Sequence, residues 1–197
     1  MRKLLIAIAL ITISYSAALA QNETDGKRQF QFKTYLSTNY QSSIGYQSWT
    51  LGTPIFALAW NNPGKSNFQE LQTSFYFSRS EINISLLELR YSYNFAFPIG
   101  EKWMPYIGVG GQQGFQNYSH EMSSSQGRFA SLTSLITTPG VQYKFNNKWA
   151  LDFNIPFHLA EYEISNTTWN DNEYSYSGFN NVLGKKINFR LGVAYTF

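Results

Sequence analysis

Residues 87–97 of the chain, LELRYSYNFAF, decide the fold. Every second residue is apolar or aromatic, and the residues between them are polar or small: Leu87, Leu89, Tyr91, Tyr93, Phe95 and Phe97 alternate with Glu88, Arg90, Ser92, Asn94 and Ala96. Side chains of a β-strand point alternately to its two faces, whereas an α-helix would scatter both sets around its circumference. The stretch therefore predicts a strand with one apolar face and one polar face.

Seven other segments carry this alternation, so eight strands are expected. It is clear in residues 151–159 and 187–197, and weaker in residues 28–37, 53–60 and 68–78, in the segment that begins at Met104 and in the segment that ends at Phe145. A membrane-crossing strand needs about 9–11 residues, and about 22 are available for each strand with its connector. The sequence predicts an all-β fold, an eight-stranded antiparallel up-and-down transmembrane β-barrel.

The composition excludes several classes of protein. The 197 residues are 43% hydrophobic and 18% aromatic but only 14% charged, against about 25% charged in an ordinary soluble domain. The mean hydropathy of −0.30 excludes a helical membrane bundle. The absence of cysteine excludes disulfides, thiolate nucleophiles, cysteine-based zinc sites and a lipid-modified N-terminal cysteine.

The first twenty residues have the pattern of a cleaved export signal. Arg2 and Lys3 precede an apolar run, and residues 18–20 form a small-x-small cleavage site. Residues 1–20 are therefore expected to be a signal peptide, residues 21–27 a flexible leader, and residues 28–197 a single barrel domain. Of 15 basic residues two lie in the signal, which leaves 13 against 12 acidic ones, so no nucleic-acid partner is expected.

Connector lengths and tryptophans indicate the two ends of the barrel. Short turn-forming connectors, NNPGKSN, PIGEKW and NNK, alternate with longer ones at residues 38–52, 116–128 and 161–185, although residues 79–83 are a short exception. Short connections on one side and long ones on the other are typical of outer-membrane barrels. Trp60, Trp103 and Trp149 flank the short turns, so we expect them to form an aromatic girdle at the inner membrane interface.

The polar strand faces carry charges that a closed barrel would enclose. They are Lys33, Glu70, Glu88, Arg90, Lys144, Asp152, His158 and Arg190. Four are basic and three acidic, apart from His158, and enclosed charges are costly unless paired, so a paired lumen network is expected. Glycines on this face, Gly108, Gly110 and Gly192, are expected to make room for long neighbours such as Tyr106 and Arg190.

Two segments resemble a known family. FRLGVAYTF at residues 189–197, with Phe189, Leu191, Val193, Tyr195 and Phe197 at alternate positions, resembles the C-terminal signal by which the barrel assembly machinery recognises outer-membrane barrels. WMPYIGVGG at residues 103–111 resembles the PY-x-G-x-G strand of the OmpA/OmpX-like outer membrane beta-barrel domain. The resemblance implies an eight-stranded up-and-down barrel in a Gram-negative cell outer membrane. Outer-membrane lipid and lipopolysaccharide are the expected partners, and a monomer is expected. The resemblance does not imply one function.

Candidate chemistry is sparse. His120 lies beside Glu121 and several serines in SHEMSSS, but the spacing does not match a lipid A deacylase, so an incidental loop histidine is favoured. His158 is either a proton-responsive lumen group or a hydrogen-bonded filler. Glu88 and Arg90 form either a gate or a structural plug, and the plug is favoured. The acidic connector 161–185 has no metal-ligand spacing and is expected to be a solvated loop, whose ends could extend the strands and offer an edge to a partner.

These observations favour a non-enzymatic integral outer-membrane barrel with a structural or surface-interaction role, a polar plugged lumen, and no metal or cofactor. A narrow channel for small solutes is the first alternative. A lipid A-modifying barrel enzyme is the second.

Overall fold

The computed structural model describes residues 28–43, 46–51, 54–61, 65–78, 82–120, 123–169, 172–180, 182–183 and 186–197. The predicted signal peptide and leader, residues 1–27, lie outside the described residues. Within the described ranges, no helix has the length and apolar content needed to cross a membrane.

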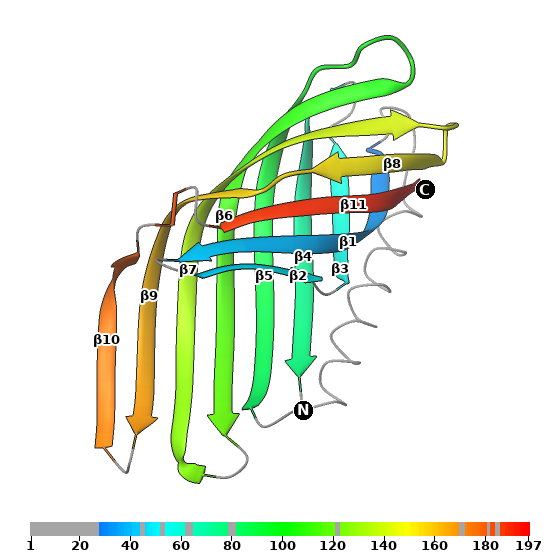
Figure 1. The fold of residues 1–197 in the computed structure, drawn as a ribbon. Coiled ribbons are helices and arrows are strands. Elements are labelled where there is room, and N and C mark those ends of the chain that lie inside the picture. Colours follow the sequence, from blue (N-terminus) through cyan, green and yellow to red (C-terminus); the bar gives the residue numbers. More distant parts are fainter. Residues whose placement is uncertain are drawn as a thin grey trace.

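Eleven strands are present in the described part of the chain (Figure 1). They are β1 (Phe30–Ser43), β2 (Tyr46–Leu51), β3 (Ile55–Asn61), β4 (Phe68–Ser78), β5 (Ile82–Ala96), β6 (Trp103–His120), β7 (Ser123–Lys144), β8 (Trp149–Asn154), β9 (Phe157–Trp169), β10 (Asn172–Asn180) and β11 (Lys186–Thr196).

These strands occupy eight positions around a closed wall. Six of the strands form three couples, β2 with β3, β8 with β9, and β10 with β11, and each couple fills one position. β2 and β3 both pair with β1, β8 and β9 both pair with β7, and β10 and β11 pair with β9 and β8 respectively. All pairings are antiparallel. The wall closes where β1 pairs with β11, from Gln31↔Thr196 to Gln41↔Lys186. The predicted eight-stranded antiparallel up-and-down barrel is confirmed.

The barrel is inverted relative to a soluble domain, with polar side chains inside and apolar ones outside. On β5, Arg90, Ser92 and Asn94 are buried, while Leu89 and Tyr91 are exposed. We call the exposed outward surface that continues around the wall the apolar band; it includes Leu36, Phe56, Leu71, Leu89, Ile107, Val109, Leu135, Phe153, Leu191 and Val193. On the outward face of β6 and β7, Thr133 donates to Gln113 at 2.7 Å, and Phe115 and Phe129 are exposed beyond this pair.

The three predicted girdle tryptophans lie at the end of the barrel that carries the short turns. Each contacts a tyrosine ring: Trp103 with Tyr143 at 4.7 Å between ring centroids, Trp149 with Tyr195 at 4.8 Å, and Trp60 with Tyr91 at 6.5 Å. Trp103 and Trp149 are about half exposed, and Trp60 is less so. Amphipathic rings at this level suit a membrane–water interface.

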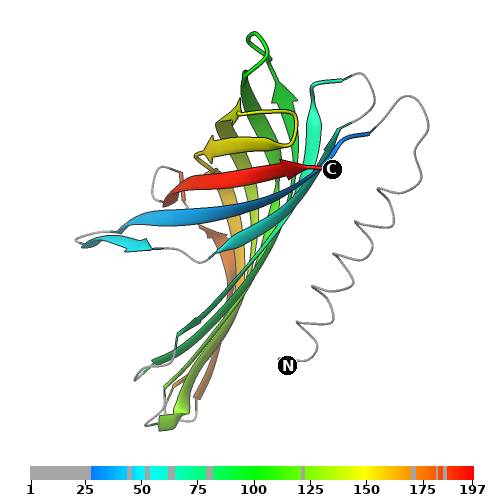
Figure 2. The same cartoon turned by 90° about the vertical axis from the view of Figure 1, so that its right-hand side faces the viewer.

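The expectation of long outer loops is wrong, and the alternative that the ends of residues 161–185 extend the strands is confirmed. Residues 116–128 belong almost wholly to β6 and β7, residues 161–185 contain most of β9 and all of β10, and residues 38–52 contain the β1–β2 hairpin. These segments are rich in Tyr, Thr, Ser and Asn, and they pair as strands although their sequence lacks the apolar alternation of the barrel wall. Figure 2 shows the outer halves of β4 to β7 continuing as a sheet, with the β1–β2 hairpin diverging from it.

Glycines on the inner face make room for tyrosines. A Cβ on Gly192 would overlap the ring of Tyr35, and one on Gly140 would overlap the ring of Tyr106. Gly192 was expected to make room for a long neighbour, with Tyr106 and Arg190 as examples. The structure instead packs it against Tyr35, which is its register partner on β1.

Candidate functional site: the charged lumen and the outer sheet

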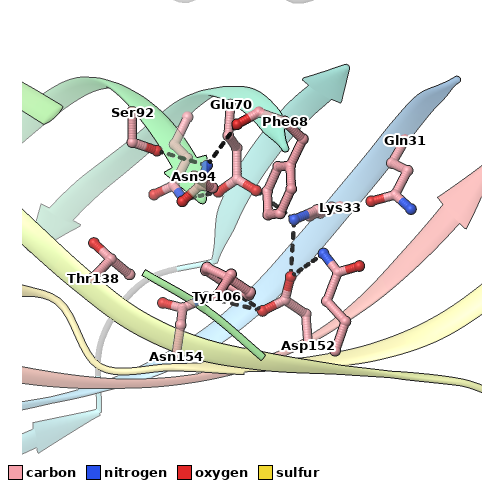
Figure 3. A network of polar contacts seen from close by, with 12 residues as sticks. Gln31, Lys33, Phe68, Glu70, Ser92, Asn94, Tyr106, Thr138, Asp152 and Asn154 are labelled. Atoms are coloured by element: carbon pink, nitrogen blue, oxygen red, sulfur yellow. Dashed lines mark hydrogen bonds and ion pairs between the residues drawn. The ribbon is translucent and has the colours of Figure 1, made fainter. Parts of the chain in front are cut away.

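Lys33 is the centre of the inner lumen. It is fully buried, and its Nζ donates to Glu70 Oε2 at 2.5 Å and to Asp152 Oδ2 at 2.8 Å. The three residues come from β1, β4 and β8, so the contacts cross the barrel (Figure 3). The ammonium group also lies 4.5 Å from the centre of the Phe68 ring, which adds a cation–π contact.

Neutral side chains complete this network around Asp152. Tyr106 donates to Oδ1 at 2.7 Å, and Gln142 and Tyr35 donate to Oδ2 at 2.8 and 3.1 Å. Asn154 donates to Oδ1 at 3.2 Å. These four residues were not predicted as network members, although all four have the inward parity of their strands. A carboxylate with this many donors is held in its charged form and in one position.

The outer half of the lumen does not form the expected ion pairs. Arg190 Nη1 donates to Gln72 Oε1 at 2.5 Å, and Arg90 donates to the hydroxyl of Thr138. Glu88 instead accepts hydrogen bonds from Ser74 at 2.8 Å and Gln112 at 3.0 Å. Among the described residues, Glu88, Arg90 and Arg190 make no ion pair within 4.0 Å, which corrects the expectation that all enclosed charges are paired.

Lys144 and His158, the two other predicted lumen residues, lie apart from each other in the barrel. Lys144 is partly exposed and lines a cavity at the inner end together with Gln31 and Met104. His158 is buried, and its Nδ1 lies 3.8 Å from Glu161 Oε2. The backbone of His120 ends β6, and its side chain lies outside the described residues.

A second polar cluster lies beyond the apolar band. Glu163 pairs with Arg128 and accepts a hydrogen bond from Asn180 at 2.8 Å. Burial raises the pKa of the Glu163 carboxyl group, but hydrogen bonds from Asn180, Ser165 and Arg128 outweigh burial and hold that pKa below its usual value. Glu161 and Glu163 are therefore buried strand residues, not members of the solvated acidic loop that the sequence predicted.

Within the part of the chain that the structure describes, the outer sheet ends in a strand with one unpaired edge. β10 pairs with β9 from Asn172↔Trp169 to Asn180↔Glu161, and no described strand pairs with its other edge. Tyr174, Tyr176 and Phe179 on β10 are 58%, 49% and 78% exposed. An exposed edge presents backbone donors and acceptors that another strand can use.

The C-terminal strand presents its predicted assembly residues on the outside. Leu191, Val193 and Phe197 are exposed, while Phe189 and Tyr195 are partly covered. Tyr195 packs between Trp149 and Phe197, and the backbone N–H of Phe197 donates to Phe30 O at 3.0 Å. The last residue thus takes part in closing the barrel.

The similarity of this chain to known proteins lies in its fold. No protein-family model matches the sequence, and no curated protein is similar to it. Among solved structures, the chain is similar to Ail, the attachment invasion locus protein of Yersinia pestis, with 15% identity, a TM-score of 0.55, and 87% of this chain and 99% of that chain covered.

Two other solved structures are also similar to the chain over most of its length. A major outer membrane protein from Thermus thermophilus has 15% identity and a TM-score of 0.53, with 86% of this chain and 99% of that chain covered. Neisserial surface protein A has 14% identity and a TM-score of 0.52, with 89% and 100% covered. Together with the observed strand pairing, these likenesses show that the chain has the fold of the small eight-stranded outer-membrane β-barrels, as the OmpA/OmpX-like resemblance implied.

Proposed function

We propose that the chain is an integral protein of a Gram-negative outer membrane that acts through its outer surface, without catalysis or solute transport. The observation that carries this proposal is the inverted polarity of the barrel. The apolar band faces outward, and the charged side chains of Lys33, Glu70, Arg90, Asp152 and Arg190 are buried inside. Only hydrocarbon makes such an outward surface favourable over so much of a closed barrel.

In this proposal the short turns face the periplasm and the outer sheet faces the medium. Residues 1–20 would direct export, and the outward residues of β11 would be recognised by the barrel assembly machinery. Lipid and lipopolysaccharide would surround a monomer. The position of Trp103 and Trp149 beside the short turns supports this orientation.

The lumen is proposed to be plugged. Lys33, Glu70 and Asp152 span it from three strands, and the buried rings of Tyr35 and Tyr106 fill the space left by glycines. A solute would have to break several charge-assisted hydrogen bonds at once to pass. The narrow-channel alternative is for this reason less favoured.

The outer sheet is the proposed interaction surface. The free edge of β10 can accept an extended segment of a partner protein, with main-chain hydrogen bonds supplying affinity and the exposed rings of Tyr174 and Tyr176 supplying side-chain contacts. Among the described residues of the outer sheet, the Glu163 carboxylate is already held by Arg128 and Asn180, which supports a non-enzymatic role.

Single cysteines test the orientation cleanly because the natural chain has none. Ser175→Cys lies on β10, and the matched control Lys148→Cys lies in the turn between β7 and β8; both positions are exposed. A membrane-impermeant maleimide should label Ser175→Cys in intact cells, and Lys148→Cys only after the outer membrane is permeabilised. Equal labelling of both in intact cells, or recovery of the protein in the soluble periplasmic fraction, would overturn the proposal.

Mass spectrometry of lipid A tests the proposal that the protein acts without catalysis. Mass spectra of lipid A should be the same whether the protein is deleted or overproduced. A mass shift that follows the protein level would favour the enzyme alternative.

A further inference from the structure

Two buried arginines flank one neutral side chain in the outer half of the lumen. Arg190 on β11 donates to Gln72 Oε1, and Gln72 on β4 is the register partner of Arg90 on β5. Arg90 is 3% and Arg190 is 4% exposed. The charge of each guanidinium group therefore acts on the other with little screening by water.

Neither arginine is neutralised by contact. The nearby carboxylates of Glu70 and Asp152 are taken by Lys33, and Glu88 is held by Ser74 and Gln112. Among the described residues, Arg90 Nε, Arg90 Nη1 and Arg190 Nε are buried and have no hydrogen-bond acceptor. Buried donors of a charged group are rarely left in this state, because their desolvation is then uncompensated.

The two arginines also line a small cavity. Its volume is about 10 Å³, and its other polar walls are Gln72, Ser74, Glu88 and Gln112, together with Thr73. A space of this size accommodates a single water-sized particle. It is too small for phosphate, sulfate or a carboxylate-bearing molecule.

We infer that Arg90 and Arg190 bind a small monatomic anion of the chloride class in this cavity. The anion accepts hydrogen bonds from the free guanidinium nitrogens and offsets one of the two adjacent positive charges. The carboxylate of Glu88 also lines the cavity and repels an anion, which lowers the affinity. Hydrogen bonds from Ser74 and Gln112 to this carboxylate offset part of that repulsion. The site does not depend on the proposed surface role.

Two other arrangements would satisfy the same arginines. A water molecule would satisfy the free donors without supplying charge. Alternatively, Glu88 could turn from Ser74 and Gln112 toward the arginines and serve as their counter-ion. Substitutions of the two arginines and of Glu88 distinguish both arrangements from a bound anion.

Chloride binding is measured by the broadening of the chlorine NMR line in the presence of the folded barrel in neutral detergent micelles. The natural protein should broaden the line in a saturable manner, and Arg90→Gln or Arg190→Gln should weaken binding by about tenfold or more. Arg128→Gln is the matched control, because it removes an arginine from the outer cluster, and it should leave the broadening unchanged. A heat-dependent shift in gel mobility shows which variants are folded.

Glu88→Gln keeps both arginines and removes one negative charge, so it does not depend on the arginine variants folding. It should tighten chloride binding several-fold. Absence of saturable broadening in the natural protein would overturn the inference and leave water as the occupant. Broadening that appears only in Glu88→Gln would also overturn it, because Glu88 would then be the counter-ion. Equal broadening by Arg90→Gln, Arg190→Gln and the natural protein would place the bound chloride elsewhere and would equally overturn it.

Discussion

Replacing Lys33 by methionine should remove a large part of the stability of the barrel. The substitution keeps the volume and apolar stem of the side chain and removes the ammonium group that holds Glu70 and Asp152. Both carboxylate oxygens lie within 2.8 Å of Lys33 Nζ. They are therefore within about 6 Å of each other, where two like charges repel by roughly 3 kcal/mol at an effective dielectric constant of 20. Loss of one partner of a buried ion pair costs about 3–5 kcal/mol, and we expect a loss in this range.

The assay is reversible urea unfolding in lipid vesicles, followed by tryptophan fluorescence. Lys148→Met, in an exposed turn, is the matched control and should stay within about 0.5 kcal/mol of the natural protein. Neutralising the carboxylates as well, in Lys33→Met/Glu70→Gln/Asp152→Asn, should restore most of the stability, because these three positions then hold no unpaired charge. A loss below about 1 kcal/mol for Lys33→Met would refute the view that this network holds the strands together.

Three other results are expected. Gly192→Ala should destabilise the barrel by about 1–3 kcal/mol because the new methyl group meets the Tyr35 ring, whereas Gly111→Ala should be nearly neutral in the same urea titration, because the nearest atom to its new methyl group is Ser134 O at 3.9 Å. Glu163 contributes stability that is complete above its unfolded pKa of roughly 4.3 and is lost as the pH falls through its lower folded pKa. The natural protein should therefore have a higher free energy of unfolding than Glu163→Gln at neutral pH, and this difference should disappear in acid. A difference that does not change with pH would contradict this. Planar bilayers containing the purified protein should show no single-channel events, and regular unitary currents would show that the lumen conducts.

The period of two in the sequence was enough to predict the wall of the barrel and the side of each strand that faces inward. Inward parity alone identified Lys33, Asp152 and Arg90 as lumen residues, because a strand has no other way to place alternate side chains. The partners of these residues were not predictable. Lys33 meets Asp152 across 119 sequence positions, and the stagger of the strands around the barrel, which sets that meeting, leaves no local signal.

The outer sheet was predicted only as an extension of the strands at the ends of residues 161–185, for two physical reasons. Segments that water reaches on both faces have no apolar alternation, so β10 and the outer parts of β6 and β7 resemble loops in the sequence. In addition, a bulge in β9 lies opposite Leu135 and Ile136 and shifts the parity of the strand by one residue. His158 before the bulge and Glu161 after it consequently both face inward. The alternation of residues 151–159, extended further, would have placed Glu161 outside.

The central claim is that the apolar side of each strand contacts hydrocarbon and the polar side is enclosed. Single cysteines introduced at successive positions from 87 to 95 on β5, each carrying a nitroxide label in lipid vesicles, test it residue by residue. Collision with oxygen, which dissolves in lipid, should be high at the odd-numbered positions and low at the even-numbered ones, and a water-soluble nickel complex should reach neither set. Free access of the nickel complex to the odd-numbered positions, or an oxygen profile without a period of two, would contradict the claim.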